Sequence, residues 1–327
     1  MMGKEGTLGR KLFTNLKKVE QEKRGNFTLT LTEKALTENM QTEDACFEAC
    51  AVILKALGWE KIKLNLDDDA KKLLPDLMEK IVNRKENALF ESNKWHSLRF
   101  LYRALRFSKQ YESWFSLGDN IKGAVNSFEF FLTDNKDKLL NNCPSNSPAK
   151  KSPSRIESIV EEMLANEKRN DVFYKAIGQS DREAKVFRQL PVGLFEGSKA
   201  KGREIFPSNK AAVDLWTIDG DTVRIVELKA ANPMVGVITE AFFYANFVRD
   251  LLDEIFDFNA ENGDESRGYN ELRNLKKETT VQGVMLADSF DPLITDDVIS
   301  VLKENGREYL DYIKASYAFD IYIKIPS

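Results

Sequence analysis

The sequence predicts an α/β protein in which a helical N-terminal domain precedes a mixed sheet flanked by helices. Before residue 143, apolar residues recur at the three- and four-residue spacing of helices. After residue 154, strand-like and helix-like segments alternate, as expected of a sheet covered by helices. Between these parts, residues 143–154 (CPSNSPAKKSPS) have the composition of a linker. A length of 327 residues also favours two domains.

The first domain, residues 1–142, is predicted to be all-α. Its amphipathic segments predict helices at residues 43–57, 70–84, 95–109 and 121–132. Residues 28–32 (TLTLT) alternate as a short strand would, but no partner strand is evident. We therefore expect helices to form the core of this domain.

The second domain, residues 155–327, is predicted to contain both helices and strands. Helices are expected at residues 155–165, 181–190, 235–256 and 295–304, and the second of these ends at Pro191. Strands are expected at residues 211–218, 222–229, 281–287 and 318–325. Asp219-Gly220 separates the first two strands and predicts a hairpin turn. Residues 259–278 are polar and predict a loop.

Several classes of function lack their sequence motifs. The chain has a single histidine, His96, so histidine-based triads and His-Glu-x-x-His zinc sites are excluded. Phosphate-binding, nucleophile-elbow and dinucleotide-binding glycine patterns do not occur. We therefore expect any chemistry to depend on carboxylates, lysine and a metal ion.

The sequence has neither the apolar stretch of a membrane span nor that of a signal peptide. No apolar run approaches the roughly 18 residues that a membrane span requires. The first residues, MMGKEGTLGRKLF, carry charges where a signal peptide needs an apolar stretch. We expect a cytoplasmic protein that does not contact membranes.

The predicted hairpin places two acids and a lysine together. With a two-residue turn at 219–220, Asp214 faces Ile225 across the strands. Asp214, Glu227 and Lys229 then share one face of the sheet, with Glu227 diagonal to Asp214. Two carboxylates in an apolar hairpin repel each other and lose hydration, so a positive partner is expected. Oxygen ligands without histidine favour Mg²⁺ or Mn²⁺ over zinc.

Over roughly residues 180–290 the sequence resembles the PD-(D/E)XK nuclease superfamily. Asp214 fits the aspartate of that motif, and Glu227-Leu228-Lys229 fits its Glu-x-Lys tripeptide. Glu183 fits the acid that many members carry on the first core helix. Val213 replaces the proline of the motif, a departure that leaves the expected metal ligands intact.

The resemblance implies a restriction-endonuclease-like mixed sheet and metal-dependent hydrolysis of phosphodiester bonds. Asp214, Glu227 and the Leu228 carbonyl would hold Mg²⁺ or Mn²⁺, and Glu183 would help to position it. Lys229 would orient the attacking water or stabilise the transition state. DNA is the favoured substrate, with RNA as the alternative. Prokaryotic defence and mobile-element processing are among the roles that such a core serves.

Two further features are weaker candidates for function. Glu240 and Tyr244 lie four residues apart on the helix after the motif, where some superfamily members place an auxiliary polar residue. In the N-terminal part, basic residues at helical spacing form a stripe opposite leucines, and this stripe consists of Arg99, Arg103, Arg106 and Lys109. The stripe either contacts a nucleic-acid backbone or forms a solvated face that pairs with acids.

Two alternatives to a nuclease stay open. The first is a non-catalytic module that keeps the nuclease-like fold to bind nucleic acid or a protein partner. The second is a structural protein whose hairpin charges face solvent. Burial of Asp214 beside Glu227 would favour a metal site, and exposure would favour the structural protein. The oligomeric state is also open, with a homo-oligomer among the alternatives.

Overall fold

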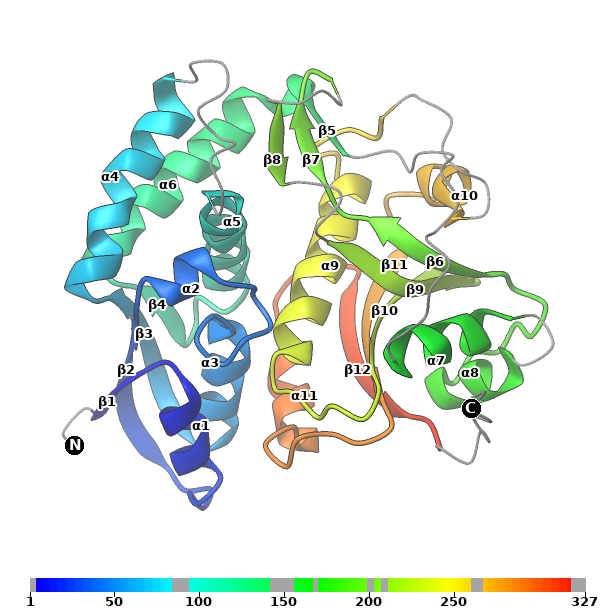
Figure 1. Ribbon diagram of the computed structural model, residues 1–327, viewed down its shortest axis with the longest axis horizontal. Helices are drawn as coiled ribbons and strands as arrows, with labels where there is room; N and C mark the ends of the chain where they lie inside the picture. Colours follow the sequence, from blue (N-terminus) through cyan, green and yellow to red (C-terminus); the bar gives the residue numbers. More distant parts are fainter. Residues whose placement is uncertain are drawn as a thin grey trace.

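A parallel sheet forms one layer of the N-terminal half (Figure 1). The computed structural model describes residues 4–83, 94–141, 156–166, 170–198, 203–206, 211–259 and 267–318. The four strands pair in chain order and are β1 (Lys4–Thr7), β2 (Arg24–Leu31), β3 (Trp59–Leu66) and β4 (Phe115–Leu117). The helices of this half are α1 (Arg10–Leu16), α2 (Lys34–Thr37), α3 (Phe47–Ala56), α4 (Asp68–Asn83), α5 (Lys94–Gln110) and α6 (Asp119–Asp134).

The prediction of an all-α N-terminal domain is therefore wrong. The four predicted helices are present as α3, α4, α5 and α6, and the predicted short strand lies in β2. Its partners β1 and β3 lie far away in the sequence, because parallel strands are joined by crossover connections rather than tight turns. β2 and β3 both alternate buried with more exposed residues, so only one face of this sheet contacts the core.

A five-stranded mixed sheet forms the centre of the C-terminal half (Figure 1). Its order is β12-β11-β10-β9-β6, with β6 (Val186–Pro191), β9 (Ala212–Asp219), β10 (Thr222–Lys229), β11 (Thr280–Ala287) and β12 (Leu310–Ser316). The helices are α7 (Ile156–Ala165), α8 (Asn170–Ile177), α9 (Val237–Leu252), α10 (Tyr269–Arg273) and α11 (Asp296–Lys303). Predicted helix 181–190 is wrong, because its second half is β6. Predicted strand 318–325 falls almost wholly outside the described residues, and β12 precedes it.

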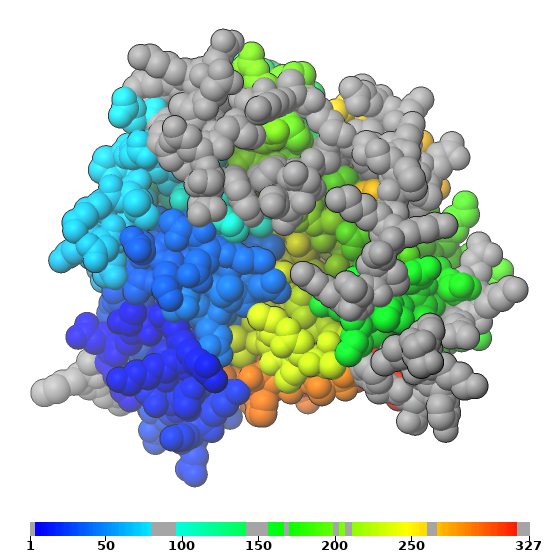
Figure 2. Space-filling view, in the orientation of Figure 1, coloured from blue at the N-terminus to red at the C-terminus, as the bar shows by residue number. Residues whose placement is uncertain are grey.

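The two faces of this sheet are covered differently. α7 and α8 pack on one face, where they share a small apolar core with β9, β10 and β11. α9 packs on the other face and also contacts α3 of the N-terminal half. All residues of α9 are consequently buried, as expected of a helix covered on every side. Figure 2 shows the blue N-terminal half lying against the yellow-green segment that leads into α9.

The two halves share a core and a sheet. One apolar cluster extends from Leu8 to Tyr312 and includes residues of both halves. A small antiparallel sheet joins β5 (Leu139–Asn141) to β7 (Leu194–Glu196) and β8 (Glu204–Phe206). The predicted linker 143–154 lies outside the described residues. In the described ranges, no helix has the length and apolar character to cross a bilayer.

The hairpin forms as predicted, but its register is shifted by two residues. Asp219 pairs with Thr222, so Gly220, with φ of 59°, and Asp221 form the turn. Trp216 therefore faces Ile225, where the sequence predicted Asp214 to face it. A shift of two preserves the face on which each side chain lies, because strand side chains alternate with a period of two.

Candidate metal-binding site

The corrected register brings Asp214 and Glu227 to the same end of the hairpin. The β9–β10 pairing runs to Leu215 opposite Val226, and Asp214 and Glu227 are the next residues on each strand. Asp214 accepts a hydrogen bond from the backbone N–H of Leu228, with 2.9 Å between N and Oδ2. The two acids thus lie opposite each other on adjacent strands. The sequence predicted the same face but a diagonal pair.

Glu157 on α7 completes a group of three acids. Glu157, Asp214 and Glu227 each contribute one carboxylate oxygen, and these oxygens all lie within 4.8 Å of one another. This is close enough for one cation to contact all three. Glu227 is buried, while Asp214 and Glu157 are half-buried, so the group opens toward solvent on one side.

Glu157, not Glu183, is therefore the helical acid of this site. Glu183 lies in an exposed loop before β6, and its N–H bonds to Asp181 rather than to the site. The sequence predicts a helix at residues 155–165, and Glu157 lies in the first turn of that helix, but it was not identified as a site residue. Because residues 181–190 were predicted to be a helix, Glu183 was assigned as the acid that many superfamily members carry on the first core helix.

Lys229 lies at the centre of the acids. Its Nζ is 2.6 Å from Glu227 Oε1, 2.8 Å from Glu240 Oε2 and 3.6 Å from Glu157 Oε1. The lysine side chain is 5% exposed, so these carboxylates replace most of its hydration. Glu240 reaches the lysine from α9, as the weaker sequence prediction proposed. One ammonium group thus lies within 4 Å of three carboxyl groups, from α7, β10 and α9.

Burial and repulsion change the protonation of this group. Burial raises the pKa of Asp214 to about 8, against the attraction of Lys229. Burial, together with Asp214 and Glu240, raises the pKa of Glu227 well above its usual range. For Lys229, burial opposes the charged form, but Glu227 and Glu240 raise its pKa and keep it an ammonium. The pKa values of the two acids therefore favour their protonated forms when no further cation is present. Lys229 stays charged because carboxyl groups surround it.

Tyr244 and Arg99 lie on the α9 side of the site. Burial, together with Glu227 and Glu240, raises the pKa of Tyr244, so its hydroxyl stays protonated near the acids. Arg99 of α5 stacks over Phe243 at 5.3 Å, and burial lowers its pKa to about 10. Arg99 is 2% exposed and lies close enough to Tyr244 and Glu240 to interact with them, so its guanidinium is in the interior and not on the surface.

The predicted basic stripe is not a surface for a nucleic-acid backbone. Arg99 and Arg103 are each 2% exposed, and Arg103 donates to both carboxylate oxygens of Glu48 at 2.7 and 2.6 Å. Arg106 is largely buried and donates to Asp250 at 2.8 Å. Lys109 is more exposed and pairs with Glu129.

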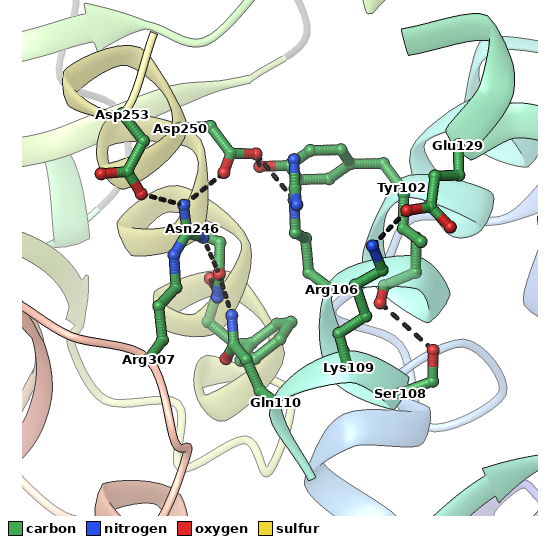
Figure 3. A network of polar contacts seen from close by, with 12 residues as sticks. Tyr102, Arg106, Ser108, Lys109, Gln110, Glu129, Asn246, Asp250, Asp253 and Arg307 are labelled. Carbon is green, nitrogen blue, oxygen red and sulfur yellow. Dashed lines mark hydrogen bonds and ion pairs between the residues drawn. The ribbon is translucent and has the colours of Figure 1, made fainter. Parts of the chain in front are cut away.

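Figure 3 shows that part of this stripe contacts buried acids of α9. Arg106 and Tyr102 of α5 both contact Asp250 of α9, and Arg307 donates to the other oxygen of Asp250 at 2.5 Å. Arg307 also donates to Asp253 at 2.7 Å. The stripe faces inward because α3 and α9 supply buried acids opposite it, and the sequence of a single helix does not reveal those partners. Comparisons of the chain with protein-family models, with curated proteins and with solved structures found no match.

Proposed function

We propose that this chain is a metal-dependent nuclease that hydrolyses phosphodiester bonds of nucleic acid, DNA in particular. The observation that carries the proposal is the convergence of Asp214, Glu227 and Glu157 around the ammonium group of Lys229. The order of elements supports it. Leaving aside α8, the β7–β8 strands and α10, which are inserted between them, helix α7, the antiparallel strands β6, β9 and β10, helix α9 and strand β11 come in the order helix, three strands, helix and strand of the PD-(D/E)XK superfamily.

The chemistry of the donors fits a divalent cation. Glu227 Oε2 is buried and has no hydrogen-bond partner among the described residues. Buried polar atoms normally have a partner, and a cation would provide one for this oxygen. Asp214, Glu227 and Glu157 would hold Mg²⁺ or Mn²⁺, with the Leu228 carbonyl as the further predicted ligand. When bound, the ion would acidify a water molecule and offset the charge that develops on the phosphate.

Lys229 would act as a donor and not as a base. Its raised pKa keeps the ammonium protonated at neutral pH, so it has no lone pair with which to accept a proton. Glu227 and Glu240 hold its Nζ at 2.6 and 2.8 Å, which limits the positions it can take. From there Lys229 would donate to the attacking water or to an oxygen of the phosphate group. Glu240 would position this lysine, and Tyr244 lies near the acids Glu227 and Glu240.

The test is cleavage of labelled single-stranded and duplex DNA and RNA by the wild type and by three variants, Lys229→Met, Asp214→Asn and Glu183→Gln. In Mg²⁺ or Mn²⁺, we expect Lys229→Met to lose at least about 100-fold in rate while still binding the ion. Glu183→Gln is the matched control, because this acid is exposed and outside the group. It should cleave as the wild type does. Thermal unfolding in Mg²⁺ checks that each variant is folded.

Two results would overturn the proposal. One is the absence of divalent-ion binding in calorimetry of the wild type. The other is cleavage that survives in both Lys229→Met and Asp214→Asn, because the activity would then come from another site or protein. If the wild type binds nucleic acid without cleaving it under all these conditions, the non-catalytic module replaces the nuclease.

A further inference from the structure

Strand β6 has an unusual backbone opposite the metal-binding acids. Arg188 pairs with Leu215 and Leu190 pairs with Val213, so Gln189 lies directly opposite Asp214. Gln189 has φ of 53°, in the left-handed region, and does not take part in the β6–β9 pairing. Left-handed backbone is uncommon for a residue with a side chain and costs free energy, so its presence beside a site suggests a role there.

The consequence is an unusual arrangement of side chains. Neighbouring residues of a regular strand point to opposite faces. Here Arg188 Nε and Gln189 Nε2 both donate to Oε1 of Glu161, each at 3.0 Å. Glu161 is on α7, one turn after Glu157, and four-residue spacing on a helix places Cβ atoms roughly 5 to 6 Å apart. The Nε edge of Arg188 is therefore held at the turn of α7 that follows Glu157.

Arg188 still has unused donors. Among the described residues its only acceptor is Glu161, contacted through Nε, so Nη1 and Nη2 have no protein partner there. Its side chain is 32% exposed. Arg103 shows the contrast, because its guanidinium uses two nitrogens on Glu48, a third contact goes to Ala45 O, and the side chain is 2% exposed. Arg103 is thus held at two nitrogens in a buried environment, whereas Arg188 is held at one nitrogen and is partly exposed.

We propose that Arg188 binds a backbone phosphate of the nucleic acid, adjacent to the metal-binding acids. This inference rests on the proposed function and adds the residue that holds the substrate. Arginine suits the task because its planar donors match two phosphate oxygens. Glu161 and Gln189 are positioning residues that fix the Nε edge and leave the Nη edge for the ligand. Pairing with Arg188 also keeps the Glu161 carboxylate from competing for the cation.

The experiment measures binding of a fluorescent DNA oligonucleotide without divalent ions, so that cleavage does not interfere. Arg188→Gln should bind about tenfold more weakly, and the slope of log affinity against log salt should fall by about 1, as expected for one lost phosphate contact. Arg188→Lys should recover part of the affinity. Arg182→Gln is the charge-matched control, since Arg182 is exposed in the loop before β6 near the hairpin turn. It should behave as the wild type.

A double variant separates binding from folding. Arg188→Gln alone leaves Glu161 without its cation and can lower stability, whereas Arg188→Gln with Glu161→Gln removes both charges. We expect the double variant to regain thermal stability but not affinity. Wild-type affinity and salt slope in Arg188→Gln would overturn the inference while leaving the nuclease proposal intact, and so would recovery of affinity in the double variant. If the wild type binds no oligonucleotide and cleaves none, both proposals fall.

Discussion

Asp214 on β9 accepts a hydrogen bond from the N–H of Leu228 on β10, with 2.9 Å between the atoms. This contact ties one acid of the proposed metal site to the strand that carries the other acid, Glu227, and the lysine, Lys229. The hairpin therefore sets the relative position of all three groups. Flexible loops are not required to bring them together.

The cost of burying Asp214 predicts a stability that depends on pH. Its pKa is about 8 in the folded protein, above the ordinary value of 3.8, so between these pH values the folded state holds a proton that the unfolded state releases. Without metal, stability should fall as pH rises from about 4 to about 8. Asp214→Asn should remove this part of the dependence and raise the free energy of unfolding at pH 8 by about 1 kcal/mol. Urea denaturation in EDTA at pH 5 and pH 8 measures both values.

Asparagine can keep the hydrogen bond from Leu228, so the comparison isolates the charge. With excess Mg²⁺ at pH 8 the order should reverse, because only the wild type gains stability from the bound ion. An Asp214→Asn protein that is less stable than the wild type at pH 8 in EDTA would contradict this account.

Asp219, on the same strand, should behave in the opposite way. Although partial burial opposes the charged form, hydrogen bonds from Ser180 and Arg224 hold the pKa of Asp219 well below its usual range. Its contribution is present above the ordinary pKa of about 4 and is lost as pH falls below it. Asp219→Asn should destabilise the protein by about 1 to 2 kcal/mol at pH 7 and by a smaller amount at pH 3, with the loss shrinking further as pH falls toward the folded pKa. The same denaturation series tests this, and equal losses at both pH values would count against it.

Metal binding should release protons. Because Asp214 and Glu227 both have raised pKa values, an ion must displace protons from them at neutral pH. We expect Mg²⁺ affinity to increase from pH 6 to pH 8. Calorimetry in two buffers of different ionisation enthalpy measures the number of protons released. An affinity that does not change over this range would exclude Asp214 as a ligand.

The placement of Glu157 predicts a contrast between two acids. Glu157→Gln should lower Mn²⁺ affinity at least about tenfold, because its carboxylate is part of the group of three. Glu183→Gln should leave the affinity unchanged, because Glu183 is exposed in a loop. Titration with Mn²⁺ followed by electron paramagnetic resonance measures both. The opposite order would restore Glu183 as the helical acid of the site.

The pair of Arg103 and Glu48 should be structural. Both side chains are buried and form two hydrogen bonds, at 2.7 and 2.6 Å. Arg103→Met should destabilise the protein by about 3 to 5 kcal/mol, because it leaves a buried carboxylate without its cation. The double variant with Glu48→Leu should recover much of this loss. Lys109→Ala, at the exposed end of the same helix, should change stability by less than about 1 kcal/mol.

The sequence alone determined the local features of this protein. The helices at α3, α4, α5 and α6 followed from apolar spacing, and the β9–β10 hairpin followed from alternation on both sides of an Asp-Gly pair. The shared face of Asp214, Glu227 and Lys229 was also predictable, because an error of two residues in register leaves the face unchanged. Each of these features depends on residues close together in the chain.

Only the tertiary structure decided the features that join distant segments. The parallel partners of β2, the position of Glu157 beside the hairpin, and the burial of Arg99 and Arg103 all depend on elements far apart in the chain. The local pattern of α5 would suit a solvated basic face equally well. The acids opposite that face come from α3 and α9, and the free energy of pairing buried charges determines which way it points.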